Sequence, residues 1–229
     1  MRLLNLYSGT DSVAVPWREA GVHEVISLDI DGRYHPEICE DILQLAYCKL
    51  PIPDVIWASP PCDQYARCRT RAKTPRNLAL ADSLVAKAIE IIKYFQELNP
   101  ALKWFLENGN YTLLWSRDVA KDLKTYTVVD YCQYGGPGYR KRTRIAHSDN
   151  LHWVPRPLCN PKTCAQRVDG KHALSAQQGP GKRNGVRTAS KLDKCALDTL
   201  HGLPRSLTEE ILKVCEQHQW DLDRALTRL

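Results

Sequence analysis

DVIWASPPC, residues 54–62, joins an apolar run to two consecutive prolines and a cysteine. The run 54–58 predicts a buried strand, because short apolar stretches bounded by turn residues suit strands packed on both faces. The two prolines make the following turn rigid. We therefore expect Cys62 to be held in one orientation at a strand end, where a thiol of lowered pKa acts as a nucleophile. A buried structural cysteine after a proline turn is the alternative.

Further strands and helices are expected on both sides of this segment. Strands are predicted over residues 2–7, 23–28, 103–106, 125–131 and 142–147. Helices are predicted over 13–20, with Gly21 as the terminating glycine, over 78–98, where apolar residues recur at helical spacing, and again from residue 192. Strands that alternate with helices predict an α/β fold with a mostly parallel sheet.

Four residues with polar or reactive character follow predicted strand ends. They are Gly9, Asp29, Cys62 and Glu107. Ligands of open α/β sheets bind at the carboxyl ends of the strands, so the shared placement predicts one common site. Taken singly, each aspartate or glutamate is equally well explained as a solvated loop residue or a helix cap.

The composition is that of an ordinary globular protein. The 229 residues are 43% hydrophobic and 25% charged, with a net charge of +6. This excludes wholesale disorder, collagen and coiled coil, and no apolar run reaches the roughly 18–20 residues of a membrane span. No export signal is expected at the N-terminus, so the nine cysteines are not expected to form disulfides. We expect an intracellular monomer without membrane contact, in the cytoplasm, or in the nucleus if the host is eukaryotic or viral.

The composition changes after residue 150, which predicts three parts. Residues 1–150 carry the α/β pattern, and residues 151–188 read as a small, basic, loop-rich lobe. Residues 189–229 are expected to form helices that pack back on the first part. A small helical ubiquitin-binding module is the alternative reading of the last stretch, 207–229.

Six motifs occur in a fixed order along the chain. They are LYSGTDSVAVPWREAGV, SLDID, EDI, DVIWASPPCDQYARCR, FLENGN and GYRKRTRIAH. This series resembles the cytosine-5 DNA methyltransferase family, in particular its short phage- and virus-type members. The resemblance covers residues 1–150 and resumes weakly over 189–204. It implies a Rossmann-like S-adenosylmethionine-dependent fold, and methyl transfer to C5 of a flipped-out cytosine in duplex DNA.

The resemblance also implies roles for individual residues. Cys62 matches the nucleophile of the family, Glu107 the glutamate of its Glu-Asn motif, and Arg142 and Arg144 its Arg-x-Arg motif. Its implied S-adenosylmethionine contacts are Tyr7, Ser8, Gly9, Thr10, Asp29, Ile30, Asp41, Ile42 and Pro60. The chain departs from the family at Asp63, where a glutamine is usual, and in the eroded glycine-rich first motif. An RNA cytosine-5 methyltransferase and a catalytically silent nucleic-acid-binding relative therefore remain alternatives.

Cysteine and histidine spacing suggests a second site. Cys159-x4-Cys164-x7-His172, joined by Cys132, offers three thiolates and one imidazole, a set that suits structural zinc. Such a metal would stabilise a loop-rich lobe that has little core of its own. Reactive or merely buried cysteines are the alternative.

Basic residues are expected to contact the DNA. In the family, the segment between the Arg-x-Arg motif and the terminal helices reads the DNA sequence, and here that segment is rich in arginine, lysine and amide side chains. The predicted nucleic-acid contacts are Arg67, Arg69, Arg140, Arg167, Lys171, Arg183 and Arg187. A solvated basic loop is the alternative.

Overall fold

The computed structural model describes residues 1–69, 72–135, 138–168, 171–172, 182–183, 186–187 and 202–226. The segment 189–201, which includes the predicted start of the last helical region, lies outside the described residues, as do the side chains of Arg183 and Arg187.

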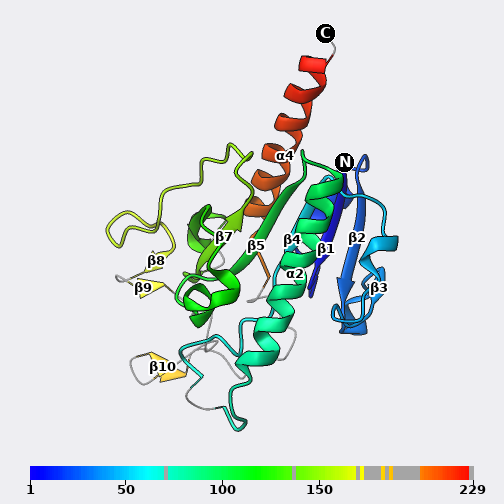
Figure 1. The fold of residues 1–229 in the computed structure, drawn as a ribbon. Coiled ribbons are helices and arrows are strands. Elements are labelled where there is room, and N and C mark those ends of the chain that lie inside the picture. Colours follow the sequence, from blue (N-terminus) through cyan, green and yellow to red (C-terminus); the bar gives the residue numbers. More distant parts are fainter. Residues whose placement is uncertain are drawn as a thin grey trace.

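A seven-stranded sheet forms the centre of the molecule, with the strand order β3-β2-β1-β4-β5-β7-β6 (Figure 1). The first five strands in this order run parallel, whereas β7 is antiparallel to both β5 and β6. The strands are β1 (Arg2–Leu6), β2 (Glu24–Asp29), β3 (Ile38–Cys39), β4 (Val55–Ala58), β5 (Lys103–Gly109), β6 (Tyr126–Asp130) and β7 (Arg142–His147). This mixed, mostly parallel sheet confirms the predicted α/β class and is consistent with a Rossmann-like methyltransferase.

Among the described residues, three α-helices and several shorter elements connect or cover the strands. The α-helices are α1 (Val15–Glu19), α2 (Leu78–Leu98) and α4 (Arg205–Leu226). The 3₁₀ helices are η1 (Gly32–Tyr34), η2 (Tyr47–Lys49), η3 (Leu113–Ser116), η4 (Asp118–Ala120) and η5 (Tyr131–Gln133). Two small antiparallel pairs stand apart from the sheet, β8 (Arg167–Val168) with β9 (Lys171–His172) and β10 (Lys182–Arg183) with β11 (Val186–Arg187).

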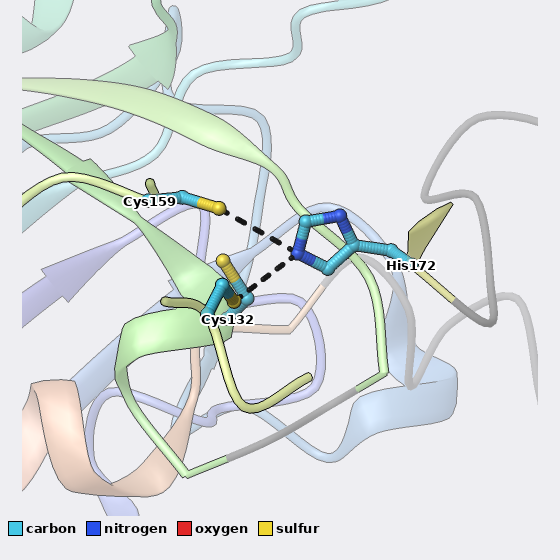
Figure 2. A group of neighbouring side chains, drawn as sticks. Cys132, Cys159 and His172 are labelled. Atoms are coloured by element: carbon cyan, nitrogen blue, oxygen red, sulfur yellow. Dashed lines mark hydrogen bonds between the residues drawn. The ribbon is translucent and has the colours of Figure 1, made fainter. Parts of the chain in front are cut away.

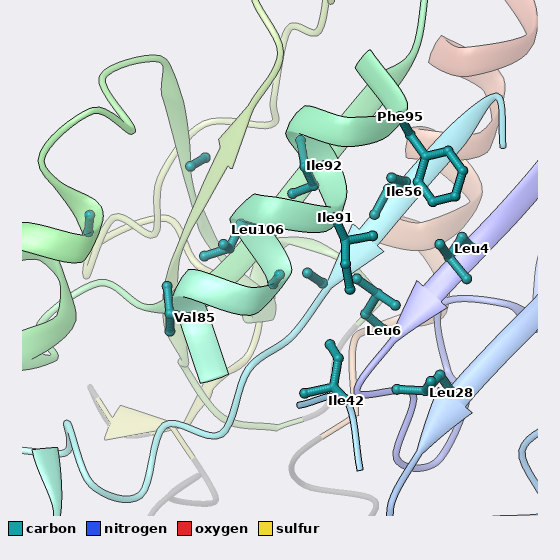
Figure 3. Packing of buried hydrophobic residues seen from close by; sticks show 14 of the residues in the cluster. Leu4, Leu6, Leu28, Ile42, Ile56, Val85, Ile91, Ile92, Phe95 and Leu106 are labelled. Atoms are coloured by element: carbon teal, nitrogen blue, oxygen red, sulfur yellow. The ribbon is translucent and has the colours of Figure 1, made fainter. Parts of the chain in front are cut away.

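The sheet separates two hydrophobic clusters. On one face, α2 presents Val85, Ile91, Ile92 and Phe95 to the strand side chains, which include Leu4, Leu6, Ile56 and Leu106 (Figure 3). On the other face, the aromatic Trp17 of α1 and the apolar residues at the start of α4, among them Leu207 and Ile211, pack with strand residues. The strands are therefore buried on both faces, which explains their nearly continuous apolar sequence.

The sequence located most of the regular elements. The predicted bounds of α2 and β7 agree with the structure, and Gly21 after α1 has the left-handed backbone (φ +68°) of a helix-terminating glycine. The two-residue strand β3 was not predicted, because two residues carry no alternation pattern. In the part of the chain that the structure describes, no helix combines the length and the apolar character needed to cross a bilayer.

Candidate active site

A cavity of about 250 Å³ lies beside the carboxyl ends of the central strands. Residues after β1 and β4 line it, together with Glu107 of β5 and Lys141 just before β7. Strand β1 pairs with β2 on one side and with β4 on the other, so the strand order reverses at this point. Such switch points open a crevice above the sheet, because the connections on either side leave in opposite directions.

The loop after β1 forms one wall of the cavity through Tyr7, Ser8, Gly9 and Thr10. Tyr7 and Gly9 both have positive φ, +58° and +49°, and the Tyr7 hydroxyl donates to the carbonyl oxygen of Leu84 at 2.8 Å. A left-handed backbone is costly for a tyrosine, so this anchor to α2 helps to hold the loop in place.

Two buried polar atoms on the same wall lack a partner within the described residues. They are the Ser8 Oγ and the Asn5 Oδ1 atoms. Asn5 donates through Nδ2 to Asp11 Oδ1 at 2.8 Å, which fixes the orientation of its amide. Both residues line the cavity, so a polar ligand bound there is one way to satisfy these two atoms, because buried polar atoms are nearly always hydrogen-bonded.

The turn that carries Cys62 is tied to β5. The Asn108 side chain donates through Nδ2 to the carbonyl oxygen of Pro60 at 3.1 Å. Further along the loop, the fully buried Tyr65 donates to Asp82 of α2 at 2.9 Å. Cys62 is exposed between these two anchors and lines the cavity. The asparagine of the Glu-Asn motif thus fixes the backbone beside the thiol, a function that the sequence did not reveal.

Glu107 faces the cavity from β5 and has two nearby partners. Its Oε1 accepts a long hydrogen bond of 3.4 Å from the buried Tyr131 hydroxyl, and the Lys141 Nζ atom lies 3.8 Å from the same oxygen. Only 7% of Glu107 is exposed. The carboxylate is therefore held by a neutral donor on one side and a cation on the other.

The pKa of the Cys62 thiol lies above its ordinary value. Desolvation by the surrounding protein atoms is the largest cause, and Glu107 and Asp63 raise the pKa further because their negative charges disfavour a thiolate. Lys141 acts in the opposite direction as the strongest influence that lowers it. The thiol thus depends on Lys141 for the positive charge that promotes ionisation.

The two arginines of the Arg-x-Arg motif lie away from the cavity lining. Arg142 forms a two-pronged ion pair with the fully buried carboxylate of Asp130, at 2.6 Å and 3.0 Å. Arg144 lies over the rings of Trp115 and Tyr126, with its guanidinium carbon 4.9 Å and 4.2 Å from the two ring centres.

Strand alternation accounts for these positions. Glu107 pairs with Ile145 across the sheet, whereas Arg144 pairs with Asn108 and therefore projects from the opposite face. The same period of two places residue 141 on the face of Glu107, opposite to residues 142 and 144. Arg144 and Glu107 therefore lie on opposite faces of the sheet, and Lys141 is the cation beside Glu107.

The other predicted cofactor residues are distributed between the cavity and its surroundings. Pro60 lines the cavity. Asp29 accepts backbone N–H groups from Gly9 and Asp31, both at 2.8 Å, and so supports the cavity loop from behind. Of the remaining three, Ile30 is exposed, Asp41 accepts from a backbone N–H nearby, and Ile42 is buried in the α2-side cluster. Their predicted contacts with a methyl donor remain predictions.

The predicted DNA contacts occupy several surfaces. Arg67 donates to the carbonyl oxygen of Tyr111, and Arg69 donates to Thr74 within its own loop. Arg140 and Lys171 are exposed, and Arg167 is half-buried in β8. Arg183 and Arg187 lie on the strand pair β10–β11, and their side chains are outside the description.

The predicted metal ligands come together in a second cluster. Cys132, Cys159, Cys164 and His172 each offer one ligand atom, and these four atoms all lie within 4.8 Å of one another. His172 Nε2 is 3.7 Å from the Cys159 sulfur (Figure 2). It is 3.5 Å from the Cys164 sulfur. The structure therefore places Cys132, which is distant in sequence from the Cys159–His172 motif, with the other three residues.

Sequence reasoning missed several residues that shape the cavity. Lys141 lies within the quoted motif GYRKRTRIAH, but the repeated arginines drew attention to the other face of the strand. Gly202 and Leu203 also line the cavity, and the Leu203 backbone N–H donates to the Ser12 hydroxyl at 3.0 Å. The weak resemblance over 189–204 was the only signal for this part of the wall.

Comparison with known proteins yields one full-length similarity. No family model matches the chain. The chain is similar to a protein of Frog virus 3 (isolate Goorha) named "Probable DNA (cytosine-5)-methyltransferase", with 28% identity over 235 aligned positions. The alignment covers 94% of this chain and all of the viral protein. The similarity therefore extends well beyond the short motifs and includes the region after residue 150.

Proposed function

We propose that this chain is a cytosine-5 methyltransferase, which transfers a methyl group from S-adenosylmethionine to C5 of cytosine in DNA through a covalent adduct with Cys62. The observation that carries this proposal is the meeting of Cys62, Glu107 and Lys141 in one cavity at the strand switch point. The name of the viral relative supports the reaction type and DNA as the substrate.

The cavity wall after β1 suits a polar methyl donor. The unpartnered Ser8 and Asn5 oxygens offer hydrogen-bond acceptors, and Ser8 offers a donor as well, to the amino-acid portion of S-adenosylmethionine. The open space at Gly9, where an added Cβ would meet no atom within 4 Å, lets a ligand approach the backbone closely. When bound, S-adenosylmethionine supplies a methyl group on a positively charged sulfur, which a carbon nucleophile can displace.

Cys62 creates that carbon nucleophile. C5 of cytosine is unreactive in the aromatic ring, so the Cys62 thiolate first forms a bond to C6. The electron pair of the former C5–C6 double bond then becomes available at C5, which would attack the methyl carbon while the sulfur–methyl bond breaks and its electron pair leaves with the neutral thioether. Transfer of the C5 proton to a water molecule then restores the C5–C6 double bond as the C6–sulfur bond breaks, which releases Cys62 as a thiolate. The rigid turn after β4 serves this sequence because it holds the sulfur in one direction.

Glu107 and Lys141 stabilise the charges that arise during addition. In its protonated form, Glu107 donates to N3 of the ring, and its carbonyl oxygen accepts from the exocyclic amine, so that negative charge entering the ring is relieved. Lys141 favours the Cys62 thiolate before attack. Its ammonium group also lies close enough to Glu107 to balance the carboxylate between turnovers.

The cavity admits the cytosine only after the base has left the duplex. A base stacked within DNA cannot bring C6 to a sulfur held above a sheet edge, so the reaction requires base flipping. We further propose that the basic segment 151–188 reads the DNA sequence, and that exposed cations such as Arg140 and Lys171 contact phosphates. Residues 1–150 and 189–229 would then form the catalytic part.

A covalent trap tests this function most directly. Duplex DNA that contains 5-fluorocytosine should form a stable adduct with the protein only when S-adenosylmethionine is present, because fluorine at C5 prevents the release of Cys62. Cys62→Ser should form no adduct, whereas Cys68→Ser, which changes another exposed cysteine of the same loop, should form it normally. The adduct is measured by denaturing electrophoresis and by mass spectrometry of the linked peptide.

The same assay distinguishes the alternative functions. An adduct that forms with the corresponding RNA but not with DNA would establish an RNA methyltransferase. Tight DNA binding without any adduct, with S-adenosylmethionine also bound, would contradict the proposal and favour a catalytically silent binder.

A further inference from the structure

We propose that Cys132, Cys159, Cys164 and His172 bind one zinc ion, which joins the segment after β7 and the β8–β9 hairpin to the catalytic sheet. This site is separate from the cavity, and the proposal does not depend on methyl transfer. The four ligand atoms lie within 4.8 Å of one another, although they come from three separate places in the chain. Cys132 is in η5, Cys159 and Cys164 belong to the segment after β7, and His172 is in β9.

The distances agree with a tetrahedral zinc site. Zinc binds cysteine sulfur at about 2.3 Å and histidine nitrogen at about 2.0–2.1 Å, so a tetrahedron separates sulfur from nitrogen by roughly 3.6 Å. His172 Nε2 lies 3.7 Å from the Cys159 sulfur (Figure 2). It lies 3.5 Å from the Cys164 sulfur. A disulfide would instead require two sulfurs about 2.05 Å apart, and the three cysteines are free thiols.

The chemistry of the ligands selects the metal and its role. Three thiolates and one imidazole are a set that zinc prefers over calcium or magnesium, which bind oxygen ligands. Four protein ligands leave no open position for water or substrate, which is the property of a structural site. The zinc is therefore expected to stabilise the fold and to take no part in the reaction.

A neighbouring amide supports the thiolates. The Gln133 Nε2 atom lies 3.6 Å from the Cys132 sulfur and 3.5 Å from the Cys164 sulfur. An N–H group directed at two sulfurs stabilises negative charge on them, as outer partners of zinc ligands do.

Contacts around the cluster lead to both the Arg-x-Arg motif and the cavity. The buried Asp130 carboxylate accepts from the Cys159 backbone N–H at 2.9 Å and from the Arg142 side chain. Tyr131, directly before Cys132, donates to Glu107. A metal that fixes Cys132 against Cys159 would therefore also fix the residues that hold β6, β7 and Glu107 in position.

Elemental analysis of the full-length protein, purified in reductant without added metal, tests the proposal. We expect about one zinc per chain. Cys164→Ser should lose most of the zinc, whereas Cys48→Ser, which changes an exposed cysteine far from the cluster in sequence, should retain it. His172→Cys should retain the metal in a four-cysteine site, which separates loss of a ligand from general damage to the fold. Cobalt in place of zinc should produce the intense absorption of tetrahedral cobalt thiolates.

Metal removal gives a second readout that does not rely on activity. A strong chelator should lower the melting temperature of the wild-type protein by on the order of 10 °C, because the metal closes a long chain segment and its binding free energy contributes to folding. It should leave Cys164→Ser almost unchanged. A protein without zinc that gives no cobalt thiolate absorption, a disulfide between two of the three cysteines, or bound iron in place of zinc would each overturn the proposal.

Discussion

The cavity and the Cys/His cluster both contain cysteine, but they place the thiol in opposite surroundings. Cys62 is exposed and has one cation, Lys141, as its main source of positive charge. Cys132 and Cys159 are buried and have other sulfurs and an imidazole as neighbours. A lone accessible thiol beside a cation is suited to attack, whereas grouped thiols are suited to share a metal. The comparison shows that the neighbours of a cysteine decide its chemistry.

Glu107→Gln should produce the largest effect and should be confined to the cavity. The amide keeps the size of the side chain but cannot supply the proton or the charge, so we expect labelled methyl transfer to fall by about 10²–10³-fold. Zinc content should be unchanged, because Glu107 is not a ligand of the cluster. Glu97→Gln, an exposed glutamate of α2, serves as the matched control. Loss of zinc together with activity would show that the two regions are not independent.

Lys141→Ala should change the reactivity of Cys62 and leave the thiols of the Cys/His cluster unaffected. Lys141 lowers the Cys62 pKa, so its removal raises a pKa that is already elevated and moves the pH profile of alkylation to higher pH. At neutral pH, alkylation of Cys62 should slow several-fold, because less thiolate is present. Lys141→Arg should preserve the rate and Lys121→Ala should have no effect. The rate is measured by mass spectrometry of the Cys62 peptide against pH. An unchanged profile would remove Lys141 from the mechanism.

The cluster thiols should respond differently in the same alkylation experiment. Cys132, Cys159 and Cys164 should stay unmodified until a chelator is added, because metal binding blocks them. Rapid modification without a chelator would show that no metal protects these three thiols.

Ser8→Ala should have the smallest effect. The Ser8 Oγ atom has no partner within the described residues, so the melting temperature should not fall when it is removed. The affinity for S-adenosylmethionine should fall by about fivefold, the value of one ordinary hydrogen bond, as measured by calorimetric titration. Ser116→Ala, an exposed serine, is the control. A lower melting temperature with unchanged affinity would assign Ser8 a purely structural role.

The elements with strong local patterns could be predicted from the sequence. The helix 78–98 has a regular apolar stripe, and the strand 142–147 has regular alternation, so both were located correctly. The proline turn also identified Cys62, and the full-length viral relative agrees with the family inferred from the motifs. These features depend on residues close together in the chain, where backbone geometry and periodicity act directly.

Local sequence pattern could not predict which face of the sheet each residue of the Arg-x-Arg segment occupies. Alternation separates residue 141 from residues 142 and 144, but only the pairing of β5 with β7 decides which set faces Glu107. Lys141, which the sequence analysis did not single out, lies beside Glu107, whereas Arg142 and Arg144 project from the other face of the strand.

Local sequence was enough to predict most strands and helices, the position of Cys62 after a rigid turn and four potential metal ligands, because each is encoded in a short stretch of chain. Only the three-dimensional fold brings Lys141 beside Glu107 and Cys132 beside three potential metal ligands from a later segment. These contacts depend on strand pairing and on folding that brings together residues far apart in the sequence. The free energy that fixes them comes from burying side chains on both faces of the sheet, which no local pattern contains.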